Sequence, residues 1–284
     1  MTEQLGLALS GGAARGLAHI GVLRVLDREG IRPSYLAGTS MGGLVAAGYA
    51  AGRTPDEMEL QAGRLSKLGQ MLRLARLGLP RHGLLKIEGL ARFLREFLKP
   101  HENFETLPIP LSLAAVDLRS AELVALDSGN LLAAIKATIA LPGVFEPVRK
   151  GAQLLVDGGV LENLPVSLAR SMGAGVIVAV DVTSDPRDEV SWKRSRMPAI
   201  SQHLWRSFSI MITQQTEWVI REIRPEIVLR PPIPAAITTI SGFRHIPEII
   251  RAGERAMQEA IPALRKLLAQ SVAEGIAVEL EGRP

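Results

Sequence analysis

Short apolar runs alternate along the chain with segments in which apolar residues recur every three or four positions. The first pattern predicts buried strands, and the second predicts amphipathic helices. Strands are expected at Leu5–Ser10, Ser34–Ala37 and Gly175–Val182, and a helix that ends at Gly30 follows the first of them. This alternation is typical of a sheet with parallel strands that is covered by helices.

The rest of the chain extends the pattern. Two neighbouring strands are predicted at 109–118 and 121–129, and a hairpin is predicted to turn at Lys150 and Gly151. Further helices are predicted at 43–52, from Thr54 and Pro55 onward, and at 87–98, 130–140 and 165–173. The chain closes with a predicted helix, strand and helix at 201–221, 226–231 and 246–270.

The chain shows no internal boundary. Its 284 residues suit one large α/β domain, and no long Pro-, Gly- or Ser-rich stretch divides them. We therefore expect a single three-layer α/β/α domain over residues 1–284, with a mostly parallel central sheet. The core motifs would lie within 5–182, and the closing elements of 199–270 would pack on the same domain.

Composition narrows the possible chemistry. With 47% hydrophobic and 22% charged residues, the chain is ordinary for a globular protein with one large core. The lack of cysteine excludes disulfides, thiolate metal sites and cysteine nucleophiles. No H-E-x-x-H motif or tight His/Asp cluster occurs, so metal catalysis is not expected.

Charge and hydropathy bear on partners and location. The net charge is +4, but aromatic residues make up only 4% and do not interleave with basic clusters, so no nucleic-acid partner is expected. The longest strongly apolar run, Met172–Val180, is far shorter than the roughly 18 to 20 residues of a membrane-spanning helix. The amino terminus lacks the basic start of a secretory signal. We expect a cytoplasmic protein, with peripheral contact to anionic membranes at most.

One segment is a candidate for that membrane contact. Between Leu60 and Ile87 the chain has six basic residues and no acidic one, interspersed with leucines. The basic residues are Arg64, Lys67, Arg73, Arg76, Arg81 and Lys86. A mobile cap that meets an anionic lipid surface fits this composition. A solvated helix pair around leucines fits it equally, because the leucines and arginines do not separate onto opposite helical faces.

Ser40 is the first candidate for chemistry. It lies between Gly38 and Gly42 in the spacing G-x-S-x-G, after a short strand and before a helix. This is the setting of a nucleophile elbow, in which side chains at the two glycines would collide with the neighbouring strand and helix. The start of the helix would stabilise a developing alkoxide. A glycine-rich turn without a nucleophile is the alternative.

A second turn from strand to helix, Ser10 to Gly16, is also rich in glycine. Gly11 and Gly12 would expose backbone N–H groups, which acyl transfer requires where a carbonyl oxygen becomes negative. Arg15 would anchor the loop or add positive field. A nucleotide-binding loop is less well supported, because the segment does not match G-x-G-x-x-G and no G-K-[ST] follows.

The third candidate is Asp157, in the segment Asp157-Gly158-Gly159. An Asp-Gly pair is commonly a hairpin turn. Here a short loop and a proline-started helix follow, so no partner strand is expected. The carboxylate would lie at the end of a strand, where open α/β sheets bind ligands.

These segments together resemble the patatin-like phospholipases. The resemblance rests on "GGAARG", "GTSMG" and "DGG" in that order, with "LAHIGVL", "LPGVFEPV" and "ENLPV" around them. It implies a patatin-like fold and a lipid acyl hydrolase that needs no cofactor and uses a Ser-Asp dyad. Ser40 would be the nucleophile and Asp157 the general base.

The resemblance also implies an oxyanion hole. Gly11, Gly12 and Ala13 would supply its N–H groups, and Arg15 matches the basic residue of the family's G-G-x-[RK]-G pattern. Many members have a third glycine where this chain has Ala13. If that position is left-handed, alanine costs about 1 kcal/mol there and displaces the donors.

Other chemistries stay open. A Ser-His-acid triad would use His203 or His245, which both follow Ser40 and Asp157 in the chain. His19 fits support of the oxyanion loop better than proton transfer. A transacylase or thioesterase would use the same nucleophile, and a non-catalytic lipid-binding regulator would keep only the fold.

Overall fold

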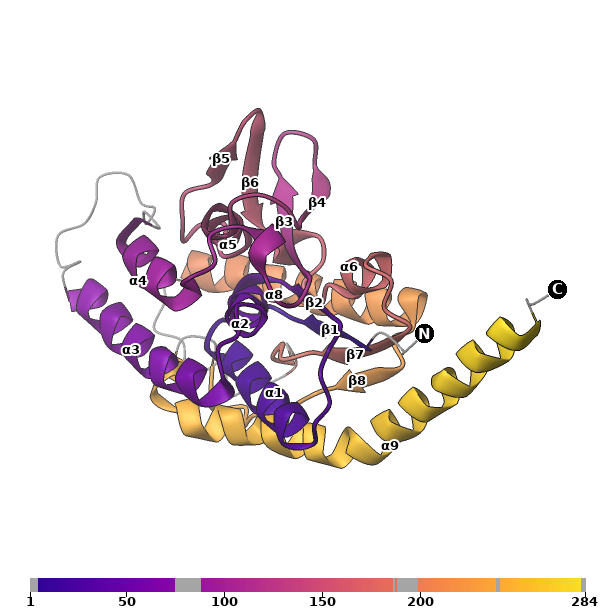
Figure 1. The fold of residues 1–284 in the computed structure, drawn as a ribbon. Coiled ribbons are helices and arrows are strands. Elements are labelled where there is room, and N and C mark those ends of the chain that lie inside the picture. The colour runs from indigo at the N-terminus through magenta and orange to yellow at the C-terminus, as the bar shows by residue number, and fades with distance from the viewer. Residues whose placement is uncertain (1–4, 75–87, 186, 188–198, 239–240, 282–284) are drawn as a thin grey trace.

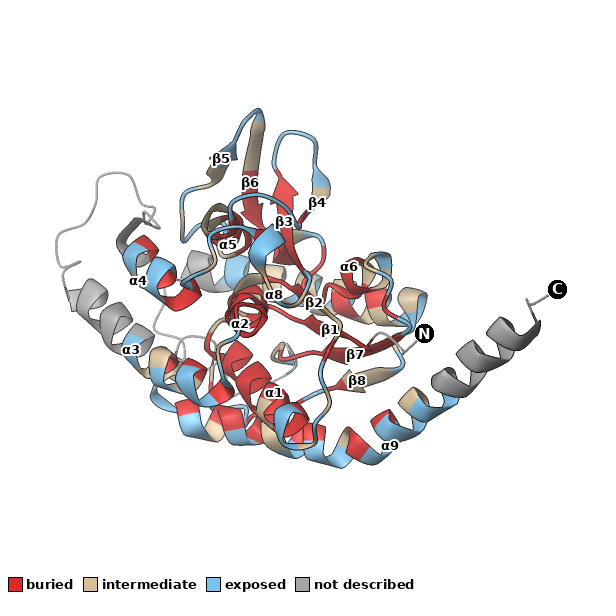
Figure 2. Cartoon of the chain, viewed as in Figure 1, coloured by how far each residue is buried: buried red, intermediate tan, exposed pale blue. Residues whose placement is uncertain are grey.

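Residues 5–74, 88–185, 187, 199–238 and 241–281 are described by the computed structural model. Their helices lie on both sides of one sheet, with the carboxyl-terminal helix reaching away from the rest (Figure 1). The central strands are buried between these helices, whereas the two strands that project at the top of the view and the outer helical faces are largely exposed (Figure 2).

The sheet has eight strands in the described residues, in the order β5-β6-β3-β2-β1-β7-β8, with β4 paired to β3. The β1–β2, β1–β7, β2–β3 and β7–β8 pairings are parallel, and those of β4, β5 and β6 are antiparallel. The strands are β1 (Leu5–Leu9), β2 (Tyr35–Gly38), β3 (Leu111–Asp117), β4 (Glu122–Leu126), β5 (Val148–Lys150), β6 (Gln153–Asp157), β7 (Val176–Val180) and β8 (Ile227–Leu229). The predicted α/β class is confirmed; the sheet is mixed, with parallel strands at its centre.

The helices agree with the hydrophobic periodicity. They are α1 (Ala18–Arg28), α2 (Ser40–Ala50), α3 (Pro55–Leu74), α4 (Glu88–Leu98), α5 (Leu131–Thr138), α6 (Val166–Ser171), α8 (Ala199–Ile223) and α9 (Ile246–Glu281). Two short 3-10 helices matter for the site, η1 (Ala13–Leu17) and η4 (Gly158–Val160). Of the two long closing helices, α9 continues well past the predicted end at 270. Within the described ranges, no helix has both the length and the apolar character needed to cross a bilayer.

Alternation along β1 builds two cores. Leu5, Leu7 and Leu9 face one side of the sheet, where they pack with α1, α2 and α9. Ala8 faces the other side, where α6 and Val219 of α8 complete a smaller core. The two cores on opposite faces make the three layers that the sequence predicts.

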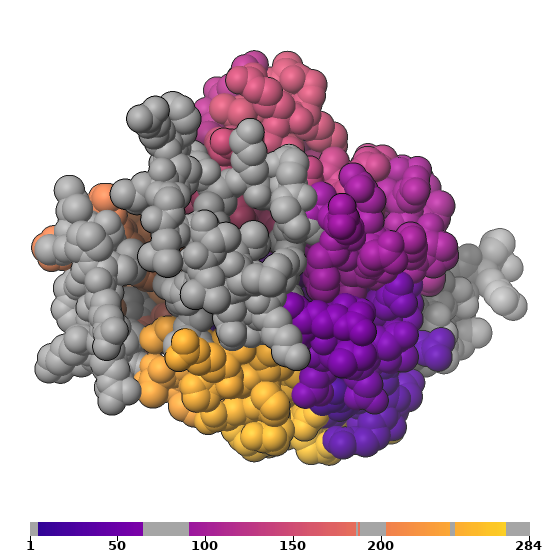
Figure 3. All heavy atoms as spheres, turned by 90° about the vertical axis from the view of Figure 1, so that its left-hand side faces the viewer, coloured from indigo at the N-terminus to yellow at the C-terminus, as the bar shows by residue number. Residues whose placement is uncertain are grey.

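Helix α9 is held against α1 by two glycines. A Cβ on Gly21 would lie 2.0 Å from the carbonyl oxygen of Ile250, and one on Gly253 would lie 1.9 Å from that of Ala18. The two backbones therefore touch, which ties the end of the chain to the first core. Seen from the side, α9 runs beside α3 (Figure 3).

Replacing Gly253 tests this contact. Gly253→Ala should destabilise the protein by about 1–3 kcal/mol, because the added Cβ forces the helices apart. The matched variant Gly63→Ala, in α3, meets nothing within 4 Å. It should leave stability unchanged or raise it by up to about 1 kcal/mol. Urea unfolding measures both; equal stability of the two variants would contradict the close α1–α9 contact.

Candidate active site

Ser40 lies where β2 turns into α2. It is the first residue of α2, and its φ of 55° lies in the left-handed region that residues other than glycine rarely adopt. Its backbone N–H donates to Oγ1 of Thr138 at 3.0 Å, and Oγ1 of Thr39 donates to the carbonyl oxygen of Glu162 at 3.0 Å. The strained turn is thus held by two distant segments.

Gly38 and Gly42 let this turn pass between its neighbours. A Cβ on Gly38 would lie 2.5 Å from Cα of Gly43 in α2. A Cβ on Gly42 would lie 2.2 Å from the carbonyl oxygen of Leu9, the last residue of β1. One glycine is therefore required by the helix and the other by the neighbouring strand, which is the steric reason that the sequence predicts.

Asp157 ends β6 and is buried, with 2% of its surface exposed. The chain continues into η4, so no partner strand crosses the turn. Oδ1 of Asp157 accepts the N–H of Gly159 at 2.8 Å. Burial raises the pKa of Asp157 to about 6, against smaller lowering effects of the Ser40 hydroxyl and the Gly159 N–H.

The structure brings Ser40 and Asp157 to one cleft. The Ser40 hydroxyl lies close enough to the Asp157 carboxylate to lower its pKa. Oδ2 of Asp157 is buried and has no hydrogen-bond partner among the described residues, so the contact falls short of full hydrogen-bond geometry. Contacts of this kind commonly tighten only when substrate binds.

The glycine-rich loop lies beside these two residues, and Gly11, Gly12 and Ala13 line the cleft. Ala13 has φ 47°, so the left-handed conformation considered from the sequence is present. No hydrogen bond within the described part of the chain uses the N–H of Gly12 or of Ala13. These two groups, at the start of η1, are the candidate oxyanion donors.

Gly11 requires a correction. The sequence predicts its N–H as an oxyanion donor, but this N–H donates to the carbonyl oxygen of Asn163 at 3.0 Å. A hydrogen bond already formed in the resting site makes the group unavailable. The lack of a side chain at Gly11 leaves room for Asn163, because a Cβ on Gly11 would lie 2.5 Å from Oδ1 of Asn163.

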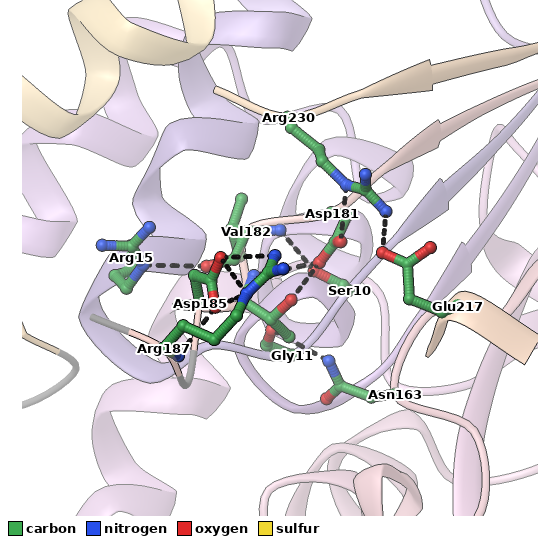
Figure 4. A network of polar contacts seen from close by, with 11 residues as sticks. Ser10, Gly11, Arg15, Asn163, Asp181, Val182, Asp185, Arg187, Glu217 and Arg230 are labelled. Atoms are coloured by element: carbon green, nitrogen blue, oxygen red, sulfur yellow. Dashed lines mark hydrogen bonds and ion pairs between the residues drawn. The ribbon is translucent and has the colours of Figure 1, made fainter. Parts of the chain in front are cut away.

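Arg15 supports the loop from behind. Its Nε donates to the carbonyl oxygen of Val182 at 2.9 Å, and its Nη1 donates to that of Ile237 at 3.1 Å. Figure 4 shows its side chain beside Val182. Arg15 is not among the described residues that line the cleft, so its side chain anchors the loop and does not face a bound ester.

His19 supports the same loop. It is fully buried, and its Nε2–H donates to the carbonyl oxygen of Ser10 at 2.9 Å. Burial lowers its pKa to about 4, so the ring is neutral at pH 7. His203 and His245 are exposed, and Nδ1 of His245 lies 3.2 Å from Oε2 of Glu248. No histidine is found among the described residues that line the cleft.

Asn163 is the residue that the sequence did not single out. It lies in the "ENLPV" segment, is buried and lines the cleft. Its Nδ2 donates to the carbonyl oxygen of Gly11 at 3.4 Å, as Figure 4 shows. In a trans peptide the next N–H points the opposite way, so this contact aims the N–H of Gly12. Only the position of Asn163 in a segment that carries the resemblance pointed to it.

Part of the cleft lining is apolar. It is formed by Trp205, Phe208 and Ile212 of α8 together with Leu141. The rings of Trp205 and Phe208 lie 6.2 Å apart between their centroids. Polar side chains at the end of β7 and on α8, among them Thr183, Ser184 and Thr213, complete the lining. The cleft is thus amphipathic.

The backbone of the basic segment of 60–87 is described only as far as Leu74, the end of α3. Arg64 is exposed on α3. The side chains of the other five basic residues, Lys67, Arg73, Arg76, Arg81 and Lys86, lie outside the described part. The membrane-cap hypothesis for this segment stays a prediction.

The model of the patatin-like phospholipase family matches residues 7–170, more than half of the chain. The chain belongs to this family. The matched region contains Ser40, Asp157 and the glycine-rich loop.

Individual relatives agree. An uncharacterized NTE family protein of Mycobacterium tuberculosis is 38% identical over 181 residues, which are 64% of this chain and 49% of the relative. Human patatin-like phospholipase domain-containing protein 6 is 28% identical over 252 residues, which are 81% of this chain and 18% of that protein. The chain thus spans about half the length of the mycobacterial relative. The crystal structure of VipD from Legionella pneumophila has the same fold, with a TM-score of 0.51, 14% identity, and coverage of 92% of this chain and 67% of that one.

The raised pKa of Asp157 predicts how the stability of the fold changes with pH. A carboxyl whose pKa is near 6 when folded and near 3.8 when unfolded stabilises the fold fully below pH 3.8. That stability is lost as the pH rises through 6. Asp157→Asn should therefore be more stable than the wild type above pH 7, by about 3 kcal/mol, and the difference should shrink towards pH 4.

Asp117 provides the control of opposite sign. Its Oδ1 accepts the N–H groups of Arg119 at 3.1 Å and Leu154 at 2.9 Å, which lower its pKa. Its stabilisation is present above the unfolded pKa and is lost in acid, so Asp117→Asn should be less stable than the wild type at neutral pH. Thermal unfolding across pH 4–8 measures both. An Asp157→Asn protein that melts below the wild type at pH 8 would contradict the assignment.

Proposed function

We propose that this protein hydrolyses carboxylic esters of lipids through an acyl-serine intermediate on Ser40. The observation that supports this most strongly is the convergence in one amphipathic cleft of Ser40, the buried Asp157 and the unused N–H groups of Gly12 and Ala13. Membership of the patatin-like phospholipase family supports the same reaction class. No step of the proposal needs a cofactor.

In the first half-reaction, Oγ of Ser40 attacks the ester carbonyl carbon while Oδ2 of Asp157 takes the hydroxyl proton. The carbonyl oxygen becomes negative and accepts hydrogen bonds from the N–H groups of Gly12 and Ala13. The bond to the alcohol oxygen then breaks, and the alcohol leaves with the proton from Asp157. The acyl group stays on Ser40.

In the second half-reaction, Asp157 takes a proton from water as the water oxygen attacks the acyl carbon. The tetrahedral intermediate collapses, the fatty acid leaves, and Ser40 recovers its proton from Asp157. A transacylase or thioesterase would follow the same steps with another acceptor or a thioester. The products therefore distinguish these alternatives.

Electrostatics make the dyad workable near neutral pH. An aspartate with the ordinary pKa of 3.8 is a weak base, whereas a pKa of about 6 is close to the working pH. The start of α2 adds a positive dipole end next to Ser40, which favours loss of the hydroxyl proton.

The wall of α8 argues for a lipid substrate. Trp205, Phe208 and Ile212 offer an apolar surface for an acyl chain beside the reacting atoms. The human relative is named a patatin-like phospholipase domain-containing protein, which agrees with this substrate class.

The direct test profiles the fatty acids released from a mixed lipid extract. Wild-type protein should release fatty acids and label with a fluorophosphonate, and Ser40→Ala should do neither.

Asp157→Asn should lower kcat about 10²- to 10⁴-fold, because proton transfer is lost. The wild-type kcat/KM should rise with pH to a plateau above about pH 6, as Asp157 ionises.

The outcomes separate the candidate functions. Undiminished fatty-acid release by Ser40→Ala would overturn the proposal. Transfer of the acyl group to an acceptor other than water would favour a transacylase. Absence of fluorophosphonate labelling in a folded wild-type protein would favour a non-catalytic lipid-binding regulator.

Asn163 should act as a positioning residue. Asn163→Ala should lower kcat about tenfold with KM unchanged, since the N–H of Gly12 is then no longer aimed. Binding of a trifluoromethyl ketone, which forms an oxyanion on Ser40, should weaken in parallel, whereas binding of a fatty-acid product should not change. A variant that loses only stability, with normal kcat, would show that Asn163 has a structural role alone.

A further inference from the structure

Helix α8 presents apolar side chains to solvent as well as to the cleft. Leu204, Met211 and Trp218 are 67%, 66% and 59% exposed. They are spaced seven residues apart, so they lie on one side of the helix, along about 21 Å of its length. Glu222, one turn beyond Trp218, ends the apolar stripe.

This stripe continues into the cleft. Leu204 precedes Trp205, which is 37% exposed and also lines the cleft with Phe208. Met211 likewise precedes Ile212, so two of the exposed apolar side chains of α8 are next in sequence to residues that line the cleft with Ser40.

A further exposed side chain lies next to the stripe. Gln215, between Met211 and Trp218 on α8, donates from Nε2 to the carbonyl oxygen of Val160 at 3.2 Å and accepts the N–H of Asn163 through Oε1 at 3.2 Å. Leu161, between those two partners in the chain, is 39% exposed. It belongs to the turn that follows Asp157, so this turn adds an exposed apolar side chain near the stripe.

Ion pairs connect α8 to the rest of the fold. Arg230 pairs with Glu217 of α8 and with Asp181 after β7, where its Nε lies 3.3 Å from Oδ2 (Figure 4). These contacts join α8 to the segments after β7 and β8, and those of Gln215 join it to the segment after Asp157.

We propose that Leu204, Met211, Trp218 and Leu161, the α8 rim, dock onto the surface of a lipid bilayer. The proposal rests on the proposed function, because an ester held in a bilayer reaches Ser40 without crossing water only if the mouth of the cleft meets the membrane. The position of the rim next to the apolar lining of the cleft favours lipid over a protein partner. A tryptophan among aliphatic side chains suits the boundary between lipid and water.

The test measures partition onto vesicles separately from catalysis. In a Ser40→Ala background, which keeps the vesicles intact, Met211→Gln/Trp218→Gln should lower flotation with phosphatidylcholine vesicles containing some phosphatidylglycerol by at least about tenfold. The control Leu118→Gln/Ile210→Gln removes two other exposed apolar side chains, 50% and 42% exposed and off the stripe. Its partition should not change.

A second measurement separates failure of docking from failure of catalysis. With Ser40 intact, Met211→Gln/Trp218→Gln should cleave a short water-soluble ester as fast as the wild type, while its release of fatty acid from vesicles falls. Lack of any esterase activity in the wild type would contradict the proposed function, whereas the result of the partition experiment would remain valid. Equal flotation of the rim variant and its parent would overturn the docking proposal, as would a change from dimer to monomer in sedimentation, which would place a second copy on the rim.

Discussion

The site depends on a carboxylate that is removed from water beside a serine hydroxyl. Asp157 is almost completely buried, and its pKa rises to about 6 for that reason. An ionised carboxylate in such a place destabilises the folded chain, so the surrounding structure must hold it. Pairing of β6 with β3 and the N–H of Gly159 do so. The same desolvation that weakens the fold makes the carboxylate a better base.

Backbone contacts bring the three loops of the site together. The N–H of Thr39 donates to the carbonyl oxygen of Leu9, and the N–H of Gly11 donates to that of Asn163. The first contact joins the Ser40 turn to β1, and the second joins the glycine-rich loop to the segment after Asp157. These segments lie so close together that Gly11, Gly38 and Gly42 have no room for a Cβ, so packing requires glycine at all three positions.

Local signals in the sequence predict most helices and strands, but they do not predict contacts between segments that are distant in the chain. Thr54 caps α3 through a 3.2 Å bond from the N–H of Glu57, and Gly151 turns the β5–β6 hairpin with φ 60°; both follow from residue preferences alone. The resemblance supplied the candidate loop but not which N–H groups are free. The bond that occupies Gly11 comes from Asn163, far along the chain, and no local pattern encodes it.

The most direct measurement is a titration of Asp157 itself. Carbon-13 NMR of the carboxyl carbon in labelled protein, assigned with Asp157→Asn, reports its protonation in the resting site. The midpoint should lie near pH 6, and it should rise further in Ser40→Ala, because the hydroxyl that lowers the pKa is gone. A midpoint near 3.8 that does not respond to Ser40→Ala would contradict the claim that the two groups meet in a desolvated dyad.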